Sequence, residues 1–148
     1  MAEEVVAELL LSEGTLDEAL RQAETAAAQA EQTGLRPATV SALEVQVRIL
    51  LCLNRPADAV MLADEALRAA EEMHYLPMVW RISAAKAQAL TRLGITAEAA
   101  AAYQAAAAII RQLAETIPDA ALKHGFLSQP LVSSIMAAAH ARTRSEKE

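Results

Sequence analysis

The chain repeats itself every forty residues. Gly14, Asn54 and Gly94 lie forty positions apart, and so do Pro37 and Pro77. The same spacing relates two sets of small residues, namely Ala19, Ala59 and Ala99, and Ala26, Ala66 and Ala106. A period of this length, with apolar residues at helical spacing between the small ones, is typical of stacked helical hairpins. Because one hairpin cannot bury both of its faces, the repeat predicts an extended stack in which each hairpin covers the next.

The composition agrees with one all-helical domain. The 148 residues are 54% hydrophobic, which is ample for a continuous core, and only 3% aromatic, which favours close packing of small side chains. Glycines and prolines fall at the boundaries of helical patterns, so no segment shows the closely spaced turn signals that are typical of a sheet protein. We therefore expect an all-α fold: a right-handed α-α superhelix of three antiparallel helical hairpins with a C-terminal helical cap.

The three hairpins are expected over residues 1–116. Their predicted helices cover 1–12, 15–33, 37–53, 56–74, 77–93 and 96–116. Thr15 with Glu18 forms a capping box at the start of the second helix, and Gly34 ends that helix. Gly14, Asn54 and Gly94 are predicted turn residues at equivalent repeat positions. Prolines begin the third, fourth and fifth helices, where a missing N–H costs nothing.

The remainder departs from the repeat. Residues 117–142 are expected to form two capping helices, 119–126, which Gly125 ends, and 130–142. Residues 143–148 are expected to be a frayed charged tail. The first helix is about one turn shorter than its repeats, which we interpret as a fragment cut from a longer array, with a shortened cap as the alternative.

Charge and cysteine content exclude several classes of partner. A net charge of −6 opposes sequence-independent binding to nucleic acid, which needs a clustered basic face. The lone Cys52 rules out an internal disulfide, suits a reducing compartment and is expected to be a buried thiol. Glu3 and Glu4 stand where a signal peptide carries positive charge, and the apolar run 99–110 is too short to cross a bilayer. We expect a soluble, cytoplasmic protein with no membrane contact.

No catalytic or metal-binding pattern stands out. The chain has no glycine-rich phosphate loop and no paired metal-ligand motif, and His74, His124 and His140 are far apart. Ser133 and Ser134 lie near His140, but no strand-turn-helix elbow presents them. We therefore expect no enzyme activity, no metal and no cofactor.

One family resemblance rests on the pattern Gly14-x-x-Asp17-Glu18-Ala19-Leu20-x-x-Ala23-x-x-Ala26. This pattern resembles the second half of a tetratricopeptide repeat, although the period is forty rather than thirty-four residues and the usual large aromatic of the first helix is largely missing. Long-helix units of this kind are similar to the arrays of large bacterial signalling ATPases and transcription regulators of the maltose-activator type. Residues 113–119 and 126–130 are similar to the end of such arrays. The resemblance implies a fragment of a larger regulator.

The resemblance also implies where a partner binds. In tetratricopeptide-like stacks the first helix of each hairpin lines the concave face. At those positions the chain has Glu4, Glu8, Ser12, Ser41, Glu44, Arg48, Arg81, Gln88 and Arg92. We interpret the last six as a peptide-binding stripe in which Arg81 and Arg92 hold a carboxylate. The alternative is the ordinary solvated face of amphipathic helices. Trp80, Tyr75, Tyr103 and Phe126 are expected in the core.

Three functions stay open from the sequence. The first is a scaffold that binds a protein or peptide segment, or neighbouring domains of a full-length protein. The second is an effector-sensing array whose concave face takes a small molecule. The third is an oligomerisation element that pairs with a second copy of the chain.

Overall fold

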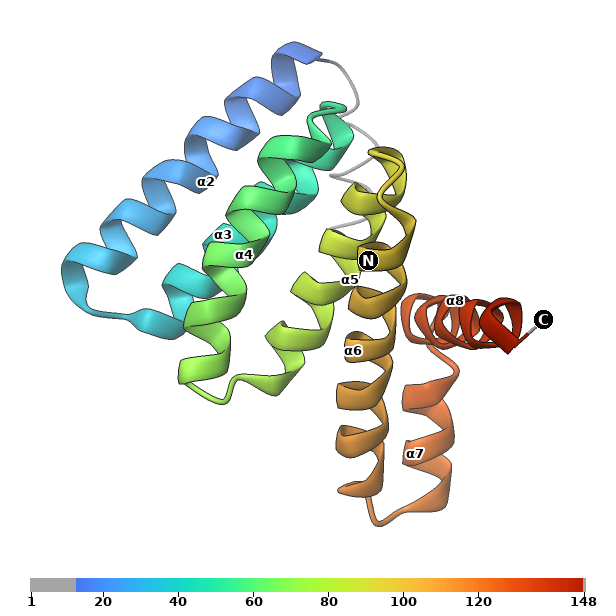
Figure 1. Cartoon of the computed structure of the whole chain (residues 1–148). Helices are drawn as coiled ribbons and strands as arrows, with labels where there is room; N and C mark the ends of the chain where they lie inside the picture. The colour runs from blue at the N-terminus through green and yellow to red at the C-terminus, as the bar shows by residue number, and fades with distance from the viewer. Residues whose placement is uncertain (1–12, 148) are drawn as a thin grey trace.

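The computed structural model describes residues 13–147, and within that range it is all-helical with no strand. Its helices are α2 (Glu13–Thr33), α3 (Arg36–Cys52), α4 (Pro56–Glu72), α5 (Leu76–Arg92), α6 (Thr96–Glu115), α7 (Ala120–Leu127) and α8 (Pro130–Lys147). Each helix of the stack packs on the next along the chain (Figure 1). The expected all-α, repeat-like fold is therefore confirmed. The helix predicted for 1–12 lies outside the described residues.

One turn geometry recurs every twenty residues. Gly34, Asn54, His74 and Gly94 have φ of 75°, 57°, 55° and 78°. After each of them, the next backbone N–H donates to a carbonyl five residues back: Leu35 to Ala30, Arg55 to Leu50 and Tyr75 to Ala70 at 2.9 Å, and Ile95 to Leu90 at 3.0 Å. This pattern is a Schellman turn, which satisfies the last carbonyls of the helix. The turn geometry thus recurs every twenty residues, whereas the side-chain pattern recurs every forty. The three helices between these turns, α3, α4 and α5, are each 17 residues long.

Several expected boundaries are wrong. Gly14 and Thr15 lie inside α2, so Gly14 is not a turn residue and Thr15 does not cap the helix. Gly125 lies inside α7, because a glycine weakens a helix without being obliged to end it. Asp119 is the N-cap of α7 and accepts from the N–H groups of Ala121 and Leu122 at 2.8 and 3.0 Å. The last helix was expected to end at 142, but it continues to Lys147, so residues 143–147 of the expected tail belong to it.

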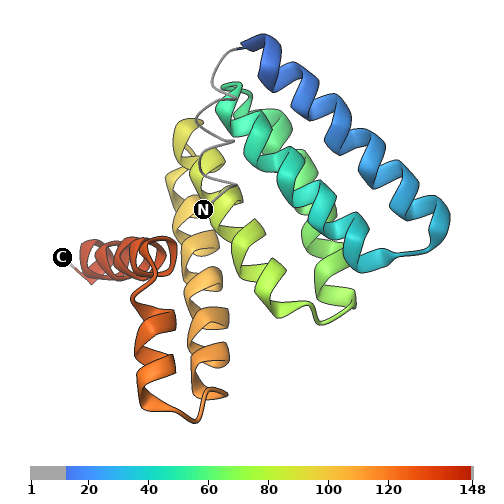
Figure 2. The same cartoon turned by 180° about the vertical axis from the view of Figure 1, so that it is seen from behind.

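The stack has two layers. Besides their chain neighbours, α3 and α5 pack directly on each other and form one layer, whereas the second layer consists of α2, α4 and α6, which pack on α3 and α5 rather than on one another. Figure 1 shows α4 in front of α3, and Figure 2 shows the opposite side, with α3 in front. Helix α4 packs on the α3/α5 layer through a face of small residues that are fully buried: Ala59, Ala63, Ala66 and Ala70. Ala99 is buried in the same way, whereas Ala19 is only half-buried.

A second apolar cluster holds the C-terminal helices. Trp80 and Ala84 of α5 and Ala106 and Ile110 of α6 pack with Val132 and Ile135 of α8. Trp80 is 3% exposed, and Tyr103 and Phe126 are half-buried against this cluster. Helix α8 crosses the stack at a steep angle (Figure 1), so it covers the apolar side of the last long hairpin. The expected core placement of Trp80 is confirmed.

Candidate protein-binding surfaces

The predicted stripe lies on two helices that contact each other, α3 and α5. Arg48, Arg81, Gln88 and Arg92 are exposed and Ser41 is half-buried. Glu44 is only 5% exposed, so it does not belong to an open surface. Its burial follows from the central position of α3, which packs against α2, α4 and α5 and has little free perimeter. The structure thus brings five of the six residues to solvent or partly to solvent.

Arg48 and Glu44 form an ion pair. The Nε of Arg48 lies 2.8 Å from Oε1 of Glu44, and the two side chains are 54% and 7% exposed. A buried carboxylate needs such a partner, because an isolated charge in the interior is strongly unfavourable. Arg48 therefore neutralises the carboxylate of Glu44, and only part of its guanidinium group is exposed to solvent.

The other two arginines also have internal contacts. Arg92 donates from Nη1 to the backbone carbonyl of Leu51, near the end of α3. A cation at this place satisfies a carbonyl at the helix end and opposes the negative end of the helix dipole. The guanidinium carbon of Arg81 lies 5.2 Å from the ring centre of Trp80, within cation–π range. Arg48 and Arg92 are thus held by an ion pair and a hydrogen bond, whereas Arg81 is held by a ring contact and keeps its N–H groups for a partner.

The α3/α5 layer and the two helices α2 and α4 carry opposite charge. Helices α3 and α5 contain five cationic side chains and one carboxylate, whereas α2 and α4 contain ten carboxylates and two arginines. Two ion pairs bridge the layers or their ends: Lys86 to Asp64 at 2.7 Å and Arg36 to Glu72 at 2.9 Å. Net charge hides this separation, which becomes visible when charges are counted helix by helix.

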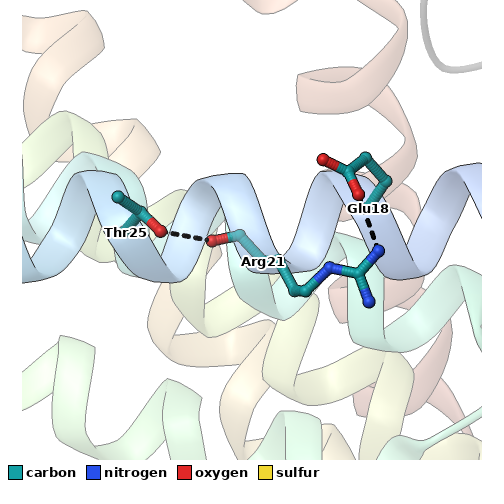
Figure 3. A network of polar contacts seen from close by, with 3 residues as sticks. All are labelled: Glu18, Arg21 and Thr25. Atoms are coloured by element: carbon teal, nitrogen blue, oxygen red, sulfur yellow. Dashed lines mark hydrogen bonds and ion pairs between the residues drawn. The ribbon is translucent and has the colours of Figure 1, made fainter.

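Figure 3 shows a network of polar contacts among Glu18, Arg21 and Thr25 on α2. An oxygen of Glu18 lies 2.6 Å from Nη2 of Arg21, and Thr25 Oγ1 donates to the carbonyl of Arg21 at 2.9 Å. The hydrogen bond and the positive charge of Arg21 lower the pKa of Glu18, and Glu18 raises the pKa of Arg21. Both side chains are exposed, so water and salt screen the pair.

A hollow opens on the acidic side, between α2 and α4, with α3 as its floor. Its volume is about 360 Å³. Apolar groups come from Leu20, Leu50, Met61 and Leu62, and polar groups from Glu24, Gln46, Arg55, Asp58 and Glu65. Met61 is 73% exposed, the highest value among the large hydrophobic residues with described side chains. Sequence reasoning placed no site here.

The polar residues of the hollow are held in place. Gln46 is 6% exposed, and its Nε2 donates to the carbonyl of Ala23 on α2 at 3.3 Å. Arg55 Nε lies 2.9 Å from Oδ2 of Asp58, so the one cation of the lining is paired with a carboxylate. Glu24 and Glu65 remain as exposed acids on the two walls.

One sequence signal could have found this hollow. In the forty-residue register Met61 and Leu62 align with Arg21 and Gln22 of the preceding unit and with two alanines of the following unit. A pair of large apolar side chains on an outward-facing segment therefore occurs only in the middle unit. The exposed Met61 is therefore a feature of this unit alone and not of the repeat.

The remaining chemical candidates do not assemble into a site. Over the described residues no three His, Cys, Asp or Glu side chains are grouped to hold a metal ion. Cys52 is exposed, so the expected buried thiol is wrong. His74 occupies a turn, and Nε2 of His124 lies 3.4 Å from Oγ of Ser128 one helical turn on. Between residues 13 and 147, no helix has the length and apolar character that a membrane span requires.

Comparison with family models, with curated proteins and with solved structures finds no match to this chain.

Proposed function

We propose that the chain is a protein-interaction scaffold whose α3/α5 face binds an acidic segment of a partner protein. The observation that supports this most is the concentration of Arg48, Arg81 and Arg92 on the exposed side of two directly packed helices. Guanidinium groups match carboxylates in geometry, and a basic surface steers an acidic partner toward it. Arg81 with the neighbouring exposed Gln88 is the centre of the proposed site, because Arg48 and Arg92 have structural partners as well.

The resemblance to tetratricopeptide-like arrays is part of this proposal. A fragment of a large bacterial signalling or transcription regulator needs a surface for a partner segment or for its own neighbouring domains. We place the protein in the cytoplasm, since an exposed free thiol such as Cys52 suits a reducing compartment. An effector-binding array and a self-associating element remain outcomes for the experiment below.

Arg81→Glu combined with Gln88→Glu is the sharpest test. Both residues are exposed, so folding should change little, while the charge at the centre of the face is reversed. The matched control is Arg68→Glu on α4, an exposed arginine of the acidic layer. Partners recovered with the unaltered chain are titrated against all three proteins at two salt concentrations.

We expect the double variant to lose at least about tenfold in affinity, the control to bind as the parent does, and added salt to weaken binding. Equal affinity of the double variant would remove the α3/α5 face from the function. A recovered partner that is a second copy of the chain, shown by concentration-dependent sedimentation, would replace the scaffold with a self-associating element.

A further inference from the structure

We infer that the hollow between α2, α3 and α4 is a second binding site, and that it takes a basic amphipathic protein segment with one apolar anchor side chain. This site lies on the acidic layer, across the stack from the α3/α5 face, and it is independent of the function proposed for that face. The hollow combines an exposed apolar anchor point, an apolar floor and acidic walls.

Met61 provides the anchor point. At 73% exposure this side chain stands on a helix whose other outward positions are mostly charged. Its neighbour Leu62 is half-buried, and Leu20 and Leu50 are buried beneath. An apolar partner side chain entering here would contact all four residues and shield Met61 from water. Methionine is suited to this role because its flexible, polarisable side chain adapts to different partner shapes.

The acidic side chains on the two walls of the hollow favour a positively charged partner. Glu24 stands on the α2 wall, and Asp58 and Glu65 stand on the α4 wall. Arg55, the one cation of the lining, pairs with Asp58, so Glu24 on one wall and Glu65 on the other are the carboxylates of the lining that this cation does not neutralise. The wider surface has the same sign, because α2 and α4 together have far more carboxylates than arginines. Lysine or arginine residues on both sides of an apolar anchor would therefore complement this site.

The shape of the hollow favours a protein segment over a small molecule. Small-molecule sites bury most of the surface of their ligand. This hollow of about 360 Å³ lies between two helices and is open to solvent rather than enclosed. An amphipathic segment laid between two helices buries one face and keeps the other in water, which fits an open hollow.

The test uses three designed 16-residue peptides with the same leucine stripe and with flanking positions that are all Lys, all Glu or all Gln. Each is titrated into the full chain by fluorescence anisotropy at low and at physiological salt. The lysine peptide should bind at least about tenfold more tightly than the glutamine peptide, and the glutamate peptide should bind most weakly. Added salt should reduce the difference.

Two variants locate the peptide. Met61→Ser should weaken the lysine peptide about tenfold, because it removes apolar contact at the anchor point. Glu24→Lys with Glu65→Lys should weaken it by at least as much. The charge-matched control is Glu31→Lys with Glu71→Lys, which changes exposed acids on the same two helices outside the hollow. The control for exposed apolar surface is Leu122→Ser on α7, where the leucine is 68% exposed.

Equal binding of the lysine and glutamate peptides, or no binding of either, would overturn the inference. So would equal losses in the two pairs of lysine variants, because the attraction would then be spread over the acidic layer. Thermal unfolding by circular dichroism verifies that each variant is folded. Arg81→Glu with Gln88→Glu should leave the lysine peptide unaffected, so failure at this site and failure at the α3/α5 face are told apart.

Discussion

Arg92, at the end of α5, donates a hydrogen bond to the backbone carbonyl of Leu51, near the end of α3. The two helices run side by side and end at the same side of the stack, so a side chain of one completes the end of the other. An arginine that looks like part of a binding stripe in the sequence is thus also a stabilising link between two repeat units.

Arg92→Ala should lower the free energy of unfolding by about 1 kcal/mol, because the Leu51 carbonyl loses a charged donor. Urea denaturation measures the change. Arg111→Ala, on the exposed side of α6, is the control and should be close to neutral. Equal effects of the two substitutions would mean that the Arg92 hydrogen bond adds nothing.

Two glycines should respond to alanine with opposite sign. Gly94 has φ of 78°, so Gly94→Ala should destabilise the protein by about 1 kcal/mol, whereas Gly14 lies within α2 and Gly14→Ala should stabilise it by up to about 1 kcal/mol. A Cβ at either position meets no atom within 4 Å, so backbone conformation alone decides the outcome. Thermal unfolding of both variants tests this, and a shift of the same sign in both would contradict the assigned geometry.

Enlarging the alanine face of α4 should force the layers apart. Ala59 is fully buried, so Ala59→Leu should cost about 1–3 kcal/mol as overpacking. Ala57→Leu, two residues away on the exposed side, supplies the same added volume without the steric conflict. Chemical denaturation should separate the two variants, and similar stabilities would place Ala59 at a looser contact.

The Glu18–Arg21 pair predicts a pH effect of definite sign. The pKa of Glu18 is lowered from its ordinary value of 4.5, chiefly by the hydrogen bond from Arg21. A carboxylate with a lowered folded pKa adds stability above its unfolded pKa and loses that contribution as the pH falls through the folded pKa. In an NMR titration Arg21→Ala should raise the pKa of Glu18, and Arg68→Ala should leave it in place. An unchanged titration in Arg21→Ala would show that the pair does not persist in solution.

Most of the helical framework could be predicted from the chain, because Pro37, Pro56 and Pro77 mark helix starts and Gly34 and Gly94 mark helix ends. The forty-residue repeat predicts the turn at Asn54, but it does not predict the one at His74, because a residue other than glycine seldom adopts the left-handed conformation. Glycine itself is ambiguous in the sequence, since Gly14 and Gly125 lie within helices. A glycine can adopt a positive φ, but its presence in the sequence does not show whether it does so.

The candidate surfaces were less predictable. Helical spacing predicts that Glu44 lies on the solvated stripe, but Glu44 is buried because three helices surround α3. The periodicity of a single helix does not show how many helices will pack around it. The hollow is formed by residues of three helices, from Leu20 to Glu65, and by the space that α2 and α4 leave above α3. Such a space depends on tertiary packing. Only the irregular pair Met61 and Leu62 hinted at it.

The recurring Schellman turns have a consequence for how this chain can change in length. Deleting one residue from a 17-residue helix such as α4 would rotate everything after it by about 100° and turn alanine faces toward water. Inserting or removing a full unit of forty residues would keep the following helices in the same orientation, because the next turn would arrive at the same point of the repeat. Single-residue insertions or deletions within the helices should therefore be far more disruptive to the stack than the gain or loss of a whole unit.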